Sequence, residues 1–183
     1  YESNDHIVSI SKLTNEIVKE VTPNVPCTHI PHAVRGDAFV PVDKKQLREQ
    51  IVQEEDRDKF IAFWNNRNAR RKHSGTLIHW WKDWLDKRDL HDKAQLIMHT
   101  EPKDPHGQDL EQIVHHLGMN GRQILFSTQK VAIEQMHSFY NIADVTINIS
   151  DAEGFGLATL ESLSCGTPII ATMTGGLQEQ VVG

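Results

Sequence analysis

The chain has 183 residues, enough for one domain of ordinary size and part of another. It carries 19 Lys+Arg against 25 Asp+Glu, and the formal net charge of -6 argues against a general nucleic-acid-binding protein. The 2 cysteines, Cys27 and Cys165, lie far apart, which excludes a disulfide framework and a zinc ribbon and favours a reducing, cytoplasmic setting. No apolar run approaches the roughly 20 residues needed to cross a bilayer.

The first part of the chain predicts short, loosely connected elements. An apolar run over His6–Ile10 is followed by a helical pattern that Pro23 ends. Residues 25–34 predict a short strand and a turn, and residues 35–42 predict a connector. The charged stretch Lys44–Lys59 predicts one helix.

From Phe60 onward, apolar runs alternate regularly with helical patterns. The predicted strands are Phe60–Trp64, Ala94–His99, Gln123–Phe126, Val145–Ile149 and Pro168–Thr172. The predicted helices lie near Ser74–Lys87, Gln108–Leu117, Ala132–Ile142 and Phe155–Ser164, with a last one after Gly175. Continuous apolar strands separated by amphipathic helices predict an α/β fold with a doubly wound parallel sheet. In such sheets ligands bind off the carboxyl ends of the strands.

The segment DAEGFGLATLE, Asp151–Glu161, predicts a strand end, a glycine-bearing turn and a helix start. The free backbone amides at a helix start favour an anion, usually a phosphate. Two glutamates, Glu153 and Glu161, flank the two glycines of this segment. They are either solvated acids near a helix end or groups with specific partners. The apolar neighbours of Glu161 favour a hydroxyl or cationic partner for that side chain.

A basic run, RNARRK, follows the Phe60–Trp64 strand. A basic run is usually a solvated face, and we expect that of Arg70 and Arg71. Arg67 and Lys72, however, are expected at the same edge of the sheet as the glycine-bearing turn. A diphosphate at this edge would be matched by a guanidinium and an ammonium.

Together with CGTPIIATMTGG, these two motifs resemble the nucleotide-binding half of retaining glycosyltransferases of the GT-B type, family 4. That family has an arginine and a lysine with four residues between them, then two glutamates with seven residues between them, and both spacings occur here. The resemblance covers about residues 60–183. It implies that residues 1–42 are the end of an N-terminal domain and a hinge. Residues 43–183 would form a Rossmann-like donor-binding domain, truncated at its C-terminus, as one half of a GT-B two-domain architecture.

The resemblance also implies roles for individual residues. Arg67 and Lys72 would neutralise the diphosphate of the donor, Glu161 would bind the ribose hydroxyls, and Glu153 would face the donor sugar. The base would lie near Gln129–Val131, with Val131 the residue we expect to contact it. The turn residues Gly154, Phe155, Gly156 and Leu157 would offer backbone amides to the sugar or its phosphate, because glycine lets a backbone approach a ligand closely. Where many relatives have asparagine and glycine in the hinge, this chain has His32 and Ala33.

The function that the resemblance implies is sugar transfer from a nucleoside-diphosphate sugar with retention of configuration, without a metal or other cofactor. The partners would be the nucleotide-sugar donor, an unidentified saccharide, lipid or protein acceptor, and a missing N-terminal GT-B domain. Without that domain the chain is expected to be inactive alone, and the parent protein to be cytoplasmic or peripheral at a membrane surface. The alternative is a binding module for nucleotides or nucleotide sugars that performs no chemistry itself.

Other motifs point to weaker interpretations. Gly154-Phe155-Gly156 resembles the start of a dinucleotide fingerprint, but Thr159 occupies the third glycine position, which argues against hydride transfer. The histidines show no metal-ligand spacing, so we expect no metal site. Sugar-nucleotide epimerases and phosphorylases share the architecture, but no lysine stands in a context that suits pyridoxal phosphate.

Overall fold

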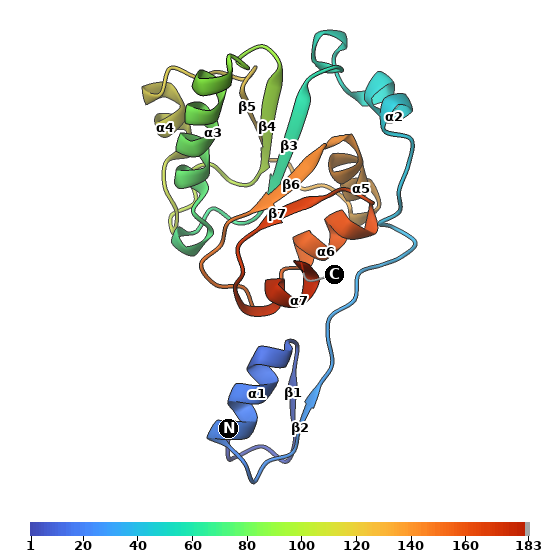
Figure 1. The fold of residues 1–183 in the computed structure, drawn as a ribbon, viewed down its shortest axis with the longest axis vertical. Helices are drawn as coiled ribbons and strands as arrows, with labels where there is room; N and C mark the ends of the chain where they lie inside the picture. The colour runs from blue at the N-terminus through green and yellow to red at the C-terminus, as the bar shows by residue number, and fades with distance from the viewer. Residues whose placement is uncertain (182–183) are drawn as a thin grey trace.

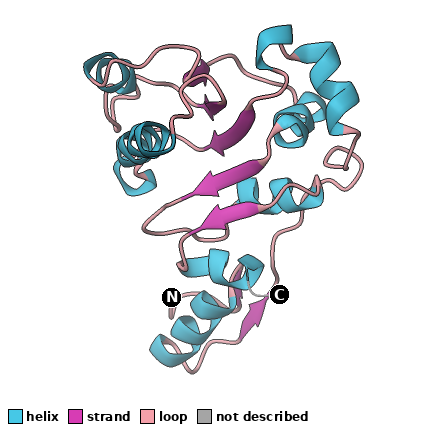
Figure 2. Ribbon diagram, turned by 45° about the horizontal axis from the view of Figure 1, so that its top comes forward, coloured by secondary structure: helices cyan, strands magenta, loops and turns pink. Residues whose placement is uncertain are grey.

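The computed structural model describes residues 1–181, and its centre is a parallel β-sheet with helices on both faces (Figure 1, Figure 2). Within these residues the sheet has 5 strands in the order β5-β4-β3-β6-β7, and all neighbouring strands are parallel. The strands are β3 (Phe60–Asn65), β4 (Ala94–His99), β5 (Ile124–Ser127), β6 (Val145–Asn148) and β7 (Ile169–Ala171). The predicted doubly wound α/β fold is confirmed.

The helices divide between the two faces of the sheet. Helices α3 and α4 pack on one face, and α5, α6 and α2 lie on the other (Figure 1). The helices after residue 43 are α2 (Lys44–Ile51), α3 (Ser74–Arg88), α4 (Leu110–His116), α5 (Ile133–Ile142), α6 (Leu157–Ser164) and α7 (Gln178–Val181). Short 3-10 turns are η1 (Glu54–Asp56), η2 (Arg70–Lys72) and η3 (Gly175–Leu177).

Strand β3 shows why the apolar runs predicted this sheet. Ile61 and Phe63 belong to the core beneath α5, whereas Ala62 and Trp64 belong to the core beneath α3 and α4. All four side chains are fully buried. Because successive side chains of a strand point to opposite faces, a strand covered on both faces needs an apolar residue at every position.

The N-terminal unit comprises β1 (Ile7–Ser9), α1 (Lys12–Val21) and β2 (Cys27–His29), with β1 and β2 paired in parallel. It lies at one end of the molecule and joins the main sheet through an extended connector (Figure 1). The backbone amide of Lys12 donates to Glu179 Oε1 at 2.5 Å, so α1 contacts the segment that follows β7. The division of the chain into domains at residue 42 stays a prediction.

The single helix predicted over Lys44–Lys59 is wrong. Helix α2 ends early, and the chain continues through an extended segment and the turn η1. The Arg48 guanidinium donates to the carbonyls of Arg57 and Lys59, both at 3.1 Å, and folds this segment back toward α2. Lys59 is buried, with its ammonium 2.6 Å from Asp56 Oδ1. A straight helix would leave these contacts unmade.

Candidate functional site

The candidate site lies where β3 and β6, neighbours at the centre of the sheet, reach their carboxyl ends. Strands added after β3 extend the sheet to one side, and those from β6 onward extend it to the other. Such a switch point opens a crevice between the loops that follow the two strands. The loop after β3 leads through η2 into α3, and the loop after β6 leads through the glycine turn, Glu153–Gly156, into α6.

Lys72 and Glu153 meet across this crevice. The Lys72 ammonium pairs with Glu153 Oε1, and each side chain is only 8% exposed. Burial disfavours the charged ammonium, and it lowers the pKa of Lys72 below the usual value although Glu153 acts in the opposite direction. The site therefore holds a cation that is poorly solvated and can gain from a second anionic partner.

Glu153 receives further hydrogen bonds from its own loop. Asn148 Nδ2 and Ser150 Oγ donate to Glu153 Oε1 at 3.2 and 3.1 Å. Burial alone would raise the pKa of Glu153, but the Lys72 ammonium and these two hydrogen bonds outweigh it and lower that pKa. Glu153 is therefore a carboxylate at neutral pH. Apart from their place at the end of a predicted strand, no pattern in the sequence points to Asn148 and Ser150.

Arg71 also belongs to this site. Its guanidinium donates to the Ala152 carbonyl at 2.6 Å and lies 3.4 Å from Glu153 Oε2. The Asp151 amide in turn donates to the Arg71 carbonyl at 2.9 Å. The prediction of a merely solvated face is wrong for Arg71, because one half-exposed guanidinium joins the two loops of the crevice. Arg70 is exposed, as predicted.

Gly156 in the glycine turn and Gly175 in η3 serve the packing of the chain on itself. Gly156 has a φ of 88°, and a Cβ on it would lie 2.4 Å from Leu177 Cδ2. Gly175 has a φ of 48°, and its Cβ would lie 1.9 Å from the Glu153 carbonyl oxygen. Both conformations favour glycine. The sequence predicts close approach to a ligand as the reason for glycine here, but at Gly154 a Cβ would make only an ordinary contact with Ile10 Cδ1, at 3.6 Å.

The start of α6 offers free amides to the crevice. Gly156 caps the helix without a side-chain hydrogen bond, and within residues 1–181 the amides of Leu157 and Ala158 have no acceptor. The Phe155 ring is buried and meets the His32 ring edge-on, with centroids 5.3 Å apart. A cleft of about 320 Å³ opens here, lined by Ile10, His32, Asn66, Lys72, Asn148, Glu153, Phe155, Gly156, Leu157 and Ala158.

Arg67 lies in the loop after β3 but does not reach the Lys72–Glu153 pair. Its side chain is 62% exposed and binds Asp104 with both ends of the guanidinium, at 2.6 and 3.1 Å. This hydrogen-bonded pair lowers the pKa of Asp104. The loop itself is fixed by the buried Asn68, whose amide donates to the carbonyls of Pro102 and Gln108.

Glu161 and Val131 lie away from the Lys72–Glu153 pair. Glu161 is in the second turn of α6, and its Oε2 accepts a hydrogen bond from the Tyr140 hydroxyl. Burial raises the pKa of Glu161, and the Tyr140 hydrogen bond offsets this only in part. Val131 is half-buried in the loop between β5 and α5. No hydrogen bond among the described residues connects it to the crevice.

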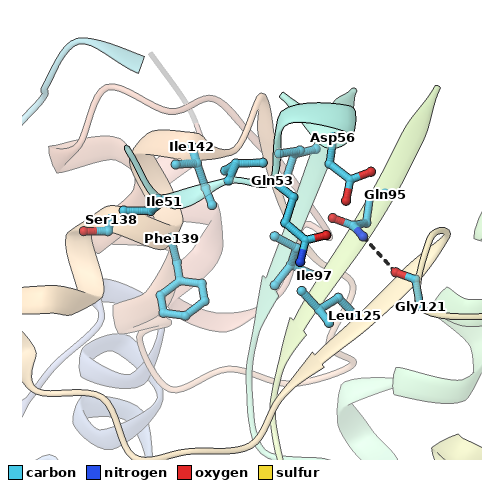
Figure 3. A pocket seen from close by; sticks show the side chains of 12 residues that line it. Ile51, Gln53, Asp56, Gln95, Ile97, Gly121, Leu125, Ser138, Phe139 and Ile142 are labelled. Carbon is cyan, nitrogen blue, oxygen red and sulfur yellow. Dashed lines mark hydrogen bonds between the residues drawn. The ribbon is translucent and has the colours of Figure 1, made fainter. Parts of the chain in front are cut away.

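A second hollow, of about 370 Å³, lies toward the amino ends of β3 and β4 (Figure 3). Ile97, Leu125 and Phe139 give it apolar walls, while Gln95 donates to the Gly121 carbonyl at 2.8 Å. The residues that line the hollow include no Lys or Arg. Because this hollow lies at the opposite edge of the sheet from the switch point, it is not the predicted anion-binding site.

The structure of residues 1–181 was also searched for metal-binding groups and membrane-spanning helices. Among residues 1–181 there is no group of three or more His, Cys, Asp or Glu side chains placed to hold a metal ion. None of the helices within that range is both long and apolar enough to span a bilayer.

Comparison with known proteins places the chain in a family. Residues 43–182 match the family model for glycosyl transferases group 1. A D-inositol 3-phosphate glycosyltransferase from Geodermatophilus obscurus is 30% identical over 156 residues, which cover 83% of this chain and 34% of that protein. The sucrose-phosphate synthase structure from Thermosynechococcus elongatus matches with a TM-score of 0.83 and 26% identity. The match covers 99% of this chain and 44% of the synthase chain. The structure of Anabaena HepE in complex with UDP and glucose matches with a TM-score of 0.77 at 16% identity. This match covers 98% of this chain and 47% of the HepE chain. The chain thus spans about a third of the curated relative and under half of the two solved structures, and it belongs to the glycosyl transferases group 1.

Proposed function

We propose that this chain supplies the donor-binding half of a retaining glycosyltransferase that moves a sugar from a nucleoside-diphosphate sugar to an acceptor. One observation carries the proposal. A buried ammonium, Lys72, faces Glu153 in a cleft at the switch point, beside the free amides of Leu157 and Ala158. Cations and helix-start amides are the groups that bind a diphosphate.

The proposed chemistry follows from where charge develops. As the glycosidic bond breaks, the departing diphosphate gains negative charge. Lys72 and the amides of Leu157 and Ala158 are already fixed in position, so they would stabilise that charge with little reorganisation. Arg67 would add its guanidinium by exchanging Asp104 for the ligand. Retention implies that the acceptor attacks from the face of the leaving group, with a phosphate oxygen helping to remove its proton.

The remaining roles concern the sugar and the nucleoside. Glu153 would accept hydrogen bonds from donor-sugar hydroxyls, because its carboxylate is ionised and lines the cleft. Glu161 would bind the ribose, and the loop around Val131 would bind the base. The backbone of Gly154, Phe155 and Gly156 would line the sugar.

The relatives support the donor class but leave the acceptor open. HepE is described in complex with UDP and glucose, which agrees with a nucleotide-sugar donor for a chain of the same fold. The chain spans only part of these proteins. We therefore also propose that the parent protein has a separate N-terminal domain that binds the acceptor. The proposal further includes transfer without a metal and a cytoplasmic location.

A thermal-shift panel of UDP, GDP and ADP tests donor binding. We expect one diphosphate to raise the melting temperature. Glu161→Ala should weaken binding of that diphosphate about tenfold or more, because hydrogen bonds to a charged group are lost. Glu153→Ala should leave nucleoside-diphosphate affinity nearly unchanged but weaken the extra affinity of the sugar nucleotide.

Two outcomes would count against the proposal. If none of the three diphosphates stabilises the folded protein, the proposal of a donor site is wrong. Donor binding by the parent protein without transfer to any acceptor would favour the non-catalytic binding module instead.

A further inference from the structure

Three elements meet at one hydrogen-bonded chain of side chains at the carboxyl end of β3. Asn65 is the last residue of β3, Tyr140 lies near the end of α5, and Glu161 lies in α6. Asn65 Nδ2 donates to the Tyr140 hydroxyl oxygen at 2.9 Å, and the Tyr140 hydroxyl donates to Glu161 Oε2. Tyr140 is fully buried, so water does not compete for these bonds.

The direction of this chain is fixed by its donors. The Asn65 amide nitrogen can only donate, so the phenol oxygen accepts, and the single phenol proton is left for Glu161. Burial, together with the neighbouring carboxylate, raises the pKa of Tyr140, so the phenol keeps its proton. Glu161 is consequently the acceptor at the end of the chain.

Glu161 depends on this hydroxyl for its charge. The titratable groups that interact with it within residues 1–181 are Tyr140 and Cys165, and neither supplies a positive charge. Burial favours the neutral carboxyl, while the hydrogen bond from Tyr140 favours the carboxylate. Only Oε2 is engaged, and within the same range Oε1 has no hydrogen-bond partner.

We propose that Tyr140, oriented by Asn65, is a positioning residue that fixes one oxygen of Glu161 and leaves the other oxygen to accept the ribose hydroxyls of the donor. This inference rests on the proposed function, because it specifies how the nucleoside part of that site is prepared. A carboxylate that is already held in place loses less freedom when the ligand binds.

The Tyr140 ring has a separate structural role. It meets the Phe63 ring edge-on, with centroids 5.1 Å apart, and the Tyr140 carbonyl accepts from Thr167 Oγ1 at 2.8 Å. Tyr140→Phe keeps the ring and removes only the hydroxyl. Thr167→Val is the matched control, because it removes a buried hydroxyl that bonds to the same residue but not to Glu161.

Two readouts on these variants test the inference. The first is the titration of the Glu161 carboxyl by carbon NMR without ligand, where Tyr140→Phe should raise the pKa of Glu161 further and Thr167→Val should not. The second is calorimetry with UDP, GDP and ADP. We expect Tyr140→Phe to weaken binding about tenfold. The loss should shrink as pH rises, because higher pH favours the Glu161 carboxylate in both proteins. Asn65→Ala should shift both readouts the same way by less.

The outcomes separate the two claims. If wild type binds a diphosphate and Tyr140→Phe matches Thr167→Val in affinity and pH dependence, the positioning role is wrong and the proposed function stands. An unchanged Glu161 titration in both Tyr140→Phe and Asn65→Ala would also overturn it. If wild type binds none of the diphosphates, the proposed function fails and the positioning role fails with it.

Discussion

Lys72 and Glu153 carry opposite charges in a place that excludes most water. Removing Lys72 leaves the buried Glu153 with only the half-exposed Arg71 guanidinium, 3.4 Å away, as a cationic neighbour, and losing the close partner of a buried charge is costly even where the pair itself adds little net stability. We therefore expect Lys72→Met to lower the free energy of unfolding by ~3 kcal/mol. The double variant Lys72→Met with Glu153→Gln should lose less, because no unpaired charge remains.

Urea denaturation of wild type, both single variants and the double variant measures this coupling. Arg70→Met is the control, since Arg70 is an exposed cation of the same basic run. A loss in the double variant equal to the sum of the losses in the two single variants would show that the pair is not coupled in the folded protein.

The raised pKa of Glu161 predicts how the free energy of unfolding depends on pH. The dependence has the opposite sign to that of a salt-bridged acid. The folded-state pKa of Glu161 is raised, so the folded protein binds the proton more readily than the unfolded chain does. Stability from this group is present below the unfolded pKa and is lost as pH rises through the folded pKa. Glu161→Gln should therefore raise the melting temperature by about 1–3 °C near pH 8 and have little effect near pH 4.

Glu134→Gln serves as the control for this titration. Its pKa is lowered by a hydrogen bond from its own backbone amide and then by one from Arg35, so the substitution should not raise the melting temperature at neutral pH. A melting temperature of Glu161→Gln at or below that of wild type near pH 8 would contradict the account of Glu161.

Motif spacing selected Lys72 and Glu153, and the structure places both in one cleft. It did not separate Arg71 from Arg70, because adjacent cations in one run differ only in the direction that tertiary packing gives them. Nor did spacing reveal that Asp104 holds Arg67, since the two residues belong to loops after different strands. Partners of this kind depend on strand order, which a local pattern does not contain.

At the scale of elements, the glycine turn and helix α6 depend on Gly156. Gly156→Ala should cost about 1–2 kcal/mol for the left-handed backbone and about 1–3 kcal/mol more for the clash with Leu177. Gly118→Ala isolates the first effect, because Gly118 has a φ of 66° and no atom near its Cβ position. Chemical denaturation of both variants measures the difference. Equal losses would show that α6 does not pack on η3 as described.

Elements buried on both faces were the most predictable. Strand β3 is apolar at each position that the core covers, so its run stands out in the sequence. The stretch Lys44–Lys59 was not predictable in the same way. Its break follows from Arg48 bonding to carbonyls that come later in the chain and from the burial of Lys59, and neither contact leaves a periodic signal.

At the scale of the whole molecule, Glu179 connects the N-terminal unit to the segment after β7. Its Oε1 accepts the Lys12 amide at 2.5 Å, and its Oε2 lies 3.7 Å from His29 Nε2. Glu179→Ala should speed hydrogen exchange of the Lys12 amide about tenfold, because an orphan amide at a helix start loses its acceptor. Glu20→Ala, an exposed acid of α1, should leave that rate unchanged. Equal rates in the two variants would mean that Glu179 does not hold α1.

The central claim is that the crevice at the switch point seats a diphosphate through Lys72 and the start of α6. The direct test is calorimetry that compares UDP with uridine, GDP with guanosine and ADP with adenosine, on wild type and on the charge-neutral double variant Lys72→Met with Glu153→Gln. For the base that the site accepts, wild type should bind the diphosphate about tenfold or more tightly than the nucleoside, and the double variant should lose most of that advantage. An advantage that is absent in wild type, or equally large in the double variant, would contradict the account.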